Sequence, residues 1–522
     1  MRTGSMRRLF SLLAAVGLVL AACSSKSSTT GAPSTPSVNG TLNLAYLADM
    51  SVPDPDVFYD IEGNTVILSA YQGLVDYKPD STTIEPVLAT SWDISPDGLT
   101  YTFHLRNGVT FQDGTPFNSA AVKASFQRRI NVNSAPAYML AQVADMQTPD
   151  PMTFVVRLKS VVTPFMDYMA SSWGPKIISP KALTDNAGND FAQTWAKANA
   201  DGTGPYKLTA FNRGQNYTLT RNDGYWGPKA NFATVNIRII PDMNSQILQL
   251  RSGGLDVILH SFPVAELPTA RGDPNLAVKD FSSYLQSLLY INTNKAPFNN
   301  LALRKAVAAD IDRDSLVTQI YGSYGHPAGS PYAPGILDQS LAPITYPTGT
   351  VKAPPGTPAI TFAYTSDESG IQSRLAGLIQ QKLQGQGFQV TVKEVTNPQV
   401  YGYATSPQTL AQAPDLLLMT NTPDAAHPDT WARILWGTGG GLNFLGYSNP
   451  QVDALLNQGA STTDRSASAQ AYGKAGQLLV ADYGILFLAD TRDVMVMRKD
   501  LTNVEHVPNY PWALRLGTLA RS

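Results

Sequence analysis

The five histidines are the residues best able to bind a metal or to act as an acid or base, and they are scattered along the chain. They are His104, His260, His326, His427 and His506. None of them has a partner at the spacing of a helical zinc motif. The segment 322–325 comes closest to the elbow that carries a serine nucleophile, and it is one residue short. We therefore expect no metal site, no cofactor and no catalytic centre.

The stretch 413–447 holds the most informative polar residues. The run 415–419 predicts an apolar strand, and a polar loop follows it. Asp424 lies in that loop, near His427. Asp424 could meet a positive group of a ligand, or it could cap a turn or the following helix. Asp429 suits the capping role better, and a lone loop histidine is more often structural than a metal ligand.

Three tryptophans are candidates for a cleft. Trp431 and Trp436 lie about one and a half turns apart if their segment is helical, so at least one belongs in the core. Of these two, we expect Trp431 to face the cleft. Trp173 stands where the composition changes to a turn-rich crossing between lobes, and pockets are common at such boundaries. Burial of Trp173 as ordinary core remains the alternative.

The elements that must position these residues are clearest in the stretch 72–129. Apolar and polar residues alternate over 99–106, which predicts a strand with one buried and one wet face. Further along, Asn118 can cap a helix that places Val122 and Phe126 one turn apart on the same face. This unit of strand and helix contains no chemistry of its own and is scaffold.

The run LATSWDISPDGLTYTFHLRNGVTFQDGTPF resembles the signature of the family 5 extracellular solute-binding proteins, the peptide, nickel and opine binding proteins of ABC importers. The resemblance implies an α/β, two-lobed periplasmic-binding-protein-like fold of type II, cluster C. An extra small α/β lobe would be inserted in the first lobe. It also implies a substrate-binding lipoprotein that takes up peptide-like solutes, closes by a hinge and docks on an ABC permease with its ATPase subunits.

The same resemblance assigns site residues. Asp424 falls where peptide-binding members place a carboxylate against the α-ammonium group of the ligand. The segment 49–51 falls at the cleft loop of the first lobe, where a peptide would pair with backbone groups. Asn421 stands where an aromatic residue is common, and His427 replaces an acidic one, which leaves open a ligand class other than plain peptides. The segment 364–368 contains no arginine to hold a peptide carboxylate.

The full predicted ligand-binding set comes from all three lobes. It consists of Asp424, Asn421, Thr422, Trp431, Asp49, Met50, Ser51, Trp173, Tyr364 and Tyr447.

Residues 1–22 have the pattern of a lipoprotein signal peptide. A basic start is followed by the apolar run 9–20 and by small residues directly before Cys23, the only cysteine. About 14 apolar residues are fewer than the ~20 that span a bilayer. We expect Cys23 to carry a lipid (palmitate) anchor, residues 23–40 to be a disordered tether, and either Met1 or Met6 to be the start.

Composition limits the partners. The 522 residues carry a net charge of −2 and are 43% hydrophobic, which argues against a nucleic-acid partner and favours a neutral or zwitterionic ligand. We expect a monomer outside the cytoplasm, anchored by lipid to the bacterial cell membrane at the cell surface or in the periplasm. The predicted lobes are 41–66 with 176–283 and 492–522 (first), 67–175 (inserted) and 284–491 (third).

Two alternatives stay open. Within the family, the ligand could be a nickel chelate, haem, an oligosaccharide or a siderophore. Outside it, the chain could be a secreted hydrolase that uses paired carboxylates, although nothing in the motifs favours an enzyme.

Overall fold

The computed structural model describes residues 40–350, 352–365 and 370–522. The predicted signal peptide, Cys23 and nearly all of the predicted tether lie outside the described residues. Within the described part, no helix is long and apolar enough to cross a membrane.

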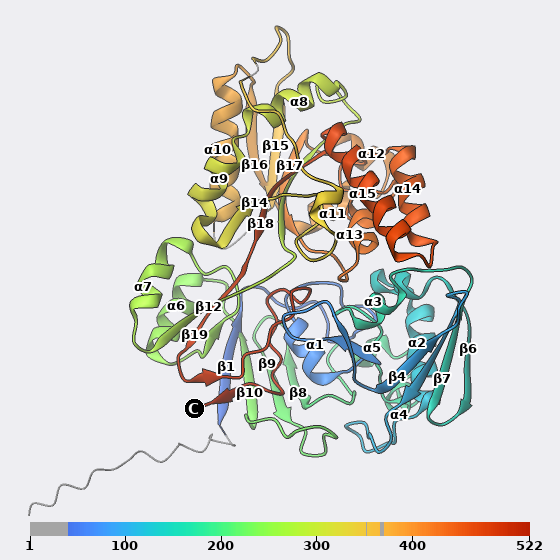
Figure 1. The fold of residues 1–522 in the computed structure, drawn as a ribbon. Helices are drawn as coiled ribbons and strands as arrows, with labels where there is room; N and C mark the ends of the chain where they lie inside the picture. The colour runs from blue at the N-terminus through green and yellow to red at the C-terminus, as the bar shows by residue number, and fades with distance from the viewer. Residues whose placement is uncertain (1–39, 351, 366–369) are drawn as a thin grey trace, which may run out of the picture. The chain divides into compact units, whose positions relative to one another are not determined.

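A seven-stranded sheet draws its strands from three separated parts of the chain (Figure 1). Its order is β12-β19-β11-β1-β10-β9-β8. The central strand β1 is parallel to β10 and β11, and the outer pairs are antiparallel. The bounds are β1 Thr41–Tyr46, β8 Tyr206–Asn212, β9 Asn216–Arg221, β10 Thr234–Ile239, β11 Val257–Ile258, β12 Leu276–Phe281 and β19 Asp493–Arg498.

A six-stranded sheet has the order β14-β18-β13-β17-β15-β16. Successive residues of β17 enter opposite cores, with Leu417 and Met419 in one cluster and Leu416 and Leu418 in the other. Both faces of this sheet are therefore buried, as the apolar run at 415–419 predicted. The bounds are β13 Gln286–Ile291, β14 Gly325–Pro327, β15 Ile360–Thr365, β16 Val390–Val395, β17 Leu416–Asn421 and β18 Ile485–Thr491.

A four-stranded antiparallel sheet contains the predicted scaffold, in the order β4-β5-β7-β6. In β5, Tyr101, Phe103 and Leu105 are buried and alternate with half-exposed residues, so the predicted strand is confirmed. Asn118 caps helix α2 by accepting a 3.0 Å hydrogen bond from the backbone N–H of Ala121, also as predicted. The bounds are β4 Ala89–Ile94, β5 Thr100–Leu105, α2 Ser119–Val132, β6 Val143–Asp150 and β7 Thr153–Leu158.

The remaining elements surround these sheets. Helices α9 and α10 contact strands of the six-stranded sheet, and α14 and α15 pack on each other (Figure 1). The principal helices are α1 Asn64–Ala70, α3 Phe165–Ala170, α4 Pro180–Asp185, α6 Met243–Ser252, α7 Leu267–Gly272, α8 Leu301–Asp310, α9 Arg313–Tyr321, α10 Ile371–Gly385, α11 Asn397–Tyr403, α12 Pro407–Ala411, α13 Pro428–Leu435, α14 Pro450–Ala460 and α15 Arg465–Asp482.

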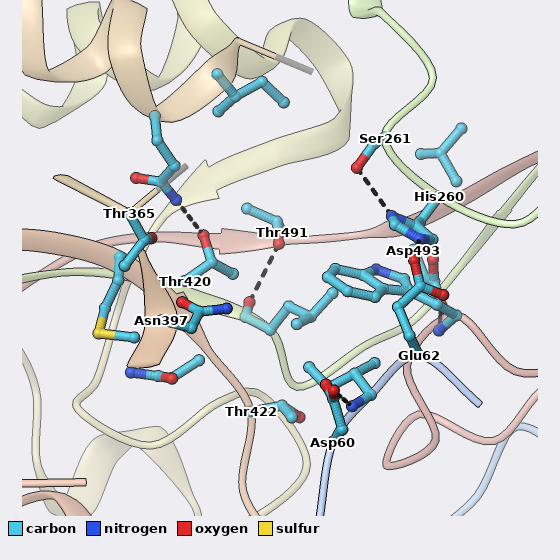
Figure 2. Close-up of a pocket in the computed structure, with 18 of the residues that line it drawn as sticks. Asp60, Glu62, His260, Ser261, Thr365, Asn397, Thr420, Thr422, Thr491 and Asp493 are labelled. Atoms are coloured by element: carbon cyan, nitrogen blue, oxygen red, sulfur yellow. Dashed lines mark hydrogen bonds and ion pairs between the residues drawn. The ribbon is translucent and has the colours of Figure 1, made fainter. Parts of the chain in front are cut away.

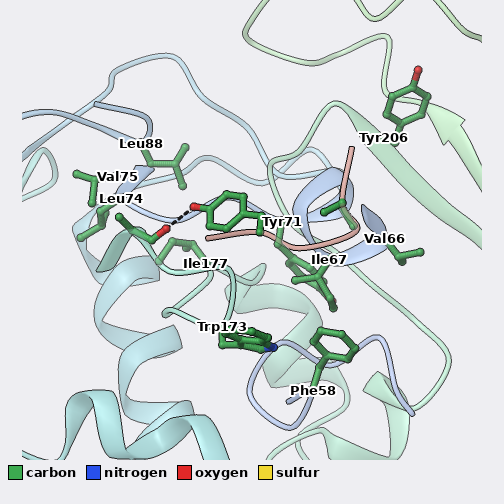
Figure 3. Close-up of a cluster of buried hydrophobic side chains, with 14 of the residues drawn as sticks. Phe58, Val66, Ile67, Tyr71, Leu74, Val75, Leu88, Trp173, Ile177 and Tyr206 are labelled. Atoms are coloured by element: carbon green, nitrogen blue, oxygen red, sulfur yellow. Dashed lines mark hydrogen bonds between the residues drawn. The ribbon is translucent and has the colours of Figure 1, made fainter. Parts of the chain in front are cut away.

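One hydrophobic core runs from the seven-stranded sheet into the four-stranded sheet. Phe58, Val66, Ile67 and Trp173 belong to its middle part (Figure 3). Beside it, a buried ion-pair network ties the loop 54–56 to helix α2. These two sheets are therefore joined by a continuous interior, in contrast to the link described next.

Only two short segments of chain connect the seven-stranded sheet with the six-stranded sheet. Residues 282–285 lie between β12 and β13, and Arg492 alone lies between β18 and β19. Arg492 Nε also pairs with Asp280 Oδ2 at 2.8 Å, which links the two crossings. These two connections lie close to the predicted limits of the third lobe, residues 284 and 491. The division of the chain into three lobes stays a prediction.

Gly202 and Gly204 pack closely against the end of helix α1. A Cβ atom at Gly204 would lie 2.2 Å from the carbonyl oxygen of Ser69, and one at Gly202 would lie 2.4 Å from that of Ala70. Only glycine permits this approach to the end of α1.

Candidate functional site

A cavity of about 370 Å³ lies between the segments of the seven-stranded sheet and those of the six-stranded sheet (Figure 2). This volume is within the range of small-ligand pockets, roughly 300–1,000 Å³. One wall comes from residues 59–62, 260–264 and 491–494. The other comes from the end of β17 and from parts of α10 and α11.

The end of β17 places a run of polar side chains at the cavity, because the chain leaves the sheet there. Asn421 Nδ2 donates to the hydroxyl of Tyr290 at 2.8 Å, which fixes the amide. Thr422 is only 6% exposed, and its hydroxyl has no hydrogen-bond partner among the described residues. A buried hydroxyl without a partner is costly, so this oxygen is available to a ligand.

Asp424 is the central charged group of this wall. Its side chain is 3% exposed, and its Oδ2 accepts hydrogen bonds from the hydroxyls of Tyr59 and Tyr138. No lysine, arginine or histidine of the described residues forms an ion pair with it. Burial raises the pKa of Asp424 to about 6, and the two tyrosine hydroxyls limit the rise. Asp424 is thus a buried carboxylate that lacks a counter-charge.

The loop 423–426 is held from several distant segments. The carbonyl oxygen of Pro423 accepts a 2.7 Å bond from Asn509 Nδ2, and that of Asp424 accepts a 2.5 Å bond from Ser171 Oγ. The N–H of Ala426 donates to the hydroxyl of Tyr77 at 3.0 Å. With these bonds in place, the six-stranded part closes on the rest of the protein around Asp424.

His260 anchors the opposite wall. One ring nitrogen lies 2.8 Å from Glu62 Oε1 and the other 2.8 Å from Ser261 Oγ. The Trp512 ring stacks on the imidazole, with centroids 4.0 Å apart and an interplanar angle of 12°. Ser261 and Trp512 both adopt left-handed backbone angles, with φ of +59° and +60°. Such conformations cost energy in residues other than glycine and are frequent at ligand sites.

Negative charge predominates around the cavity. Its lining contains four carboxylates and, among the described residues, Arg492 as the only lysine or arginine. The carboxylates are Asp60, Glu62, Asp424 and Asp493. No group of three or more histidine, cysteine or acidic residues in the described chain could hold a metal ion. The site suits a cationic organic group better than a bare metal.

Four of the predicted ligand-binding residues line the cavity. They are Asn421, Thr422, Asp424 and Trp173. Trp173 also belongs to the hydrophobic core, which was the alternative prediction for this residue. Its side chain is buried, and its Nε1 donates to the carbonyl oxygen of Asp60 at 2.9 Å.

Trp431 does not face the cleft, so that prediction is wrong. Its side chain is fully buried and its Nε1 donates to the carbonyl oxygen of Pro331 at 2.8 Å.

The prediction that Asp429 caps helix α13 is also wrong. The capping residue is His427, whose ring nitrogen accepts a hydrogen bond from the N–H of Asp429. Burial lowers the pKa of His427 to about 4, so the ring is neutral and structural.

The other predicted residues lie away from the cavity lining. Asp49 accepts from the hydroxyl of Tyr217, Met50 is fully buried and Ser51 is exposed. Tyr364 bonds to Glu394 at 3.2 Å, while its neighbour Thr365 lines the cavity. Tyr447 is buried and donates to Asp482 at 2.6 Å.

Several residues of the site carried no signal in the sequence. The two hydroxyls that donate to Asp424 belong to Tyr59 and Tyr138, which are separated from it in the sequence by 365 and 286 positions. The stacked pair His260 and Trp512 is likewise separated by most of the C-terminal half. No local pattern marks such contacts, because they depend on how the sheets are placed.

Comparisons with known proteins cover most of the chain. A family model described as "Bacterial extracellular solute-binding proteins, family 5 Middle" matches residues 83–443. The chain is 28% identical over 497 residues to a probable D,D-dipeptide-binding periplasmic protein of Escherichia coli (strain K12), covering 92% of this chain and 94% of the relative. It is 30% identical over 473 residues to a glutathione-binding protein of Pectobacterium atrosepticum, covering 87% and 90%.

Solved structures agree. The ABC transporter-associated periplasmic binding protein of Helicobacter pylori in complex with the peptide STSA superposes with a TM-score of 0.80 at 25% identity, covering 92% of this chain and 98% of the other.

Proposed function

Because the chain belongs to the bacterial extracellular solute-binding proteins of family 5, we propose that it captures a peptide-like solute in the cavity and delivers it to the permease of an ABC importer. Its role is binding and release, without catalysis. The relatives named above bind a D,D-dipeptide and glutathione, and the similar structure holds a four-residue peptide.

The observation that carries the proposal is the state of Asp424. A carboxylate that is 3% exposed and has no basic partner in the described chain is held at a considerable cost in free energy. An ammonium group from a ligand would supply the missing charge through a charge-assisted hydrogen bond. The α-ammonium group of a peptide has the size and charge for this position.

Closure follows from the same contacts. Tyr59, on the opposite wall of the cavity, and Tyr138, which lies outside the lining, both donate to Asp424, so these bonds form only when the six-stranded part is close to the rest of the protein. A ligand that bridges both walls interacts better with this closed form and shifts the population toward it. The short crossings at 282–285 and at Arg492 would serve as the hinge.

Membrane attachment completes the proposal. A lipid on Cys23, followed by a flexible tether, would keep the monomeric binding protein near its permease outside the cytoplasm.

Binding of peptides with free and with acetylated N-termini tests the proposal. Native mass spectrometry of the purified protein first identifies any peptide that co-purifies. Calorimetry then compares each peptide with its N-acetylated form on the wild type, on Asp424→Ala and on the control Asp338→Asn, an exposed carboxylate outside the cavity. Asp424→Ala should weaken only the free-amine peptides, by at least about tenfold. Equal losses for both forms would contradict the ammonium contact.

A further inference from the structure

We propose that the natural ligand carries a second cationic group, received by Asp60 and Glu62 beside the Trp512 ring. The ligand would be a peptide-like compound with a basic side chain in addition to its terminal ammonium group. This inference rests on the proposed function and names its substrate class.

Asp60 is the first observation behind it. Its side chain is exposed and lines the cavity (Figure 2). Its Oδ1 accepts a 2.7 Å bond from the N–H of Ile61, and no ion pair with a described lysine, arginine or histidine satisfies its charge. The adjacent Glu62 bonds to His260 and lines the same cavity. Two neighbouring carboxylates therefore face the ligand space.

The charge of the whole lining points the same way. The four carboxylates and Arg492 carry a formal charge of −3 when His260 and His506, which pair with Glu62 and Asp493, are both neutral. Arg492 is already paired with Asp280 at 2.8 Å. One ammonium group at Asp424 would leave the cavity strongly negative, and charges interact more strongly in such a partly enclosed space than in water. A second positive group on the ligand would reduce the remaining negative charge of the cavity.

Two buried polar atoms of the cavity residues support a bound ligand. On the wall that holds Asp60, Asp493 Oδ1 has no hydrogen-bond partner among the described residues, although Asp493 Oδ2 pairs with His506. On the opposite wall, the hydroxyl of Thr422 also has no partner among the described residues. The half-buried Trp512 ring is held by its stacking on His260, despite its left-handed backbone. A ring held in this way offers a cation–π contact to an ammonium or guanidinium group.

The opposite charge fits poorly. A ligand with an acidic side chain would meet Asp60 and Glu62, with only the paired Arg492 to receive it. Unlike charges attract and like charges repel by similar amounts at the same distance, so acidic ligands should be rejected as clearly as basic ligands are preferred.

Peptides that differ in a single side chain test this inference. Calorimetry compares sets of two to four residues in which one position is lysine, N-acetyllysine or glutamate. The lysine peptide should bind at least about tenfold more tightly than its acetyllysine counterpart at one position, with the glutamate peptide weakest. Equal binding of lysine and acetyllysine at every position would overturn the inference while leaving the proposed function intact. If no peptide binds at all, both fail.

A variant locates the second group. Asp60→Asn should reduce the ratio of the affinities for the lysine and acetyllysine peptides at least about threefold, with the larger loss for the lysine peptide. Asp97→Asn is the matched control, because Asp97 is also exposed and accepts from a nearby backbone N–H, at 3.0 Å, but lies outside the cavity. An unchanged preference in Asp60→Asn, with a wild-type melting temperature, would overturn the assignment to this carboxylate.

Discussion

Replacing Asp424 by asparagine should stabilise the ligand-free protein. Both tyrosine hydroxyls donate to the same atom, Oδ2, so an amide oxygen at that position keeps both hydrogen bonds. The variant loses the buried charge, and its NH2 group takes the place of Oδ1. In the wild type the pKa of Asp424 is raised to about 6, against about 3.9 for an aspartate in an unfolded chain. A rise of about two pH units corresponds to a penalty of ~3 kcal/mol when the carboxylate is ionised.

The sign of the pH dependence follows from the direction of this shift. The folded state binds the proton more tightly than the unfolded chain, so the penalty is fully present above pH ~6 and is relieved as the pH falls. It should vanish below pH ~3, where Asp424 is protonated in both states. The gain from Asp424→Asn is therefore largest at pH 7–8 and disappears on acidification.

Thermal unfolding of ligand-free protein measures the gain. With roughly 480 folded residues, the unfolding entropy is ~1 kcal/mol/K, so ~3 kcal/mol corresponds to a rise of ~3 °C in the melting temperature at pH 7.5. The melting temperatures of both proteins, measured at several values from pH 8 to pH 3, should converge toward the acid end. A variant that melts below the wild type at pH 7.5, or a difference at pH 3 as large as at pH 7.5, would refute the reasoning. A bound free-amine peptide should reverse the order, because only the wild type gains the charge pair.

Three further substitutions test the fold around the site. Trp431→Ala should lower the unfolding free energy by about 3–5 kcal/mol in urea, since the ring is fully buried, and a small loss would contradict its place in the core. Asp56→Asn should cost about 3–5 kcal/mol, because it leaves buried guanidinium groups such as that of Arg129 without a full counter-charge, and an unchanged urea midpoint would argue against the network. Gly204→Ala should lower the melting temperature, as its Cβ would lie 2.2 Å from a carbonyl oxygen, whereas Gly402→Ala, with nothing within 4 Å, should not.

Local patterns in the sequence predicted local structure well. The alternation in β5 and the Asn118 cap are both present, because each depends on residues a few positions apart. The predicted fold class, a two-lobed α/β fold of the periplasmic-binding-protein type, is confirmed by the family model and by solved structures. The prediction of the fold class rested on the run LATSWDISPDGLTYTFHLRNGVTFQDGTPF, whose residues build the scaffold and do not form the site.

The candidate site was predicted only where it follows a strand. Asn421, Thr422 and Asp424, at and just after the end of β17, line the cavity, while their role in ligand binding stays a prediction. On the opposite wall the prediction chose 49–51, yet the cavity is lined by Ala48 and by 59–62. Asp49 instead accepts a hydrogen bond from the hydroxyl of Tyr217, and Met50 is fully buried. The prediction that Trp431 faces the cleft failed because the consecutive residues 428–432 of α13 are all buried. Helical spacing alone does not reveal that several faces of a helix are buried.

The single-residue link between β18 and β19 leaves the chain no slack at this crossing. The strands before and after Arg492 belong to different sheets and are hydrogen-bonded almost up to that residue, so any swing of one sheet relative to the other is concentrated in its φ and ψ angles. Arg492 also lines the cavity. In the proposed closure, the residue about which the two sheets turn is therefore itself part of the cavity lining. A ligand in contact with Arg492 would then limit how closely the two sheets approach. Its bulk at that point, as well as its charge at Asp424, would decide how far the two sides can shut.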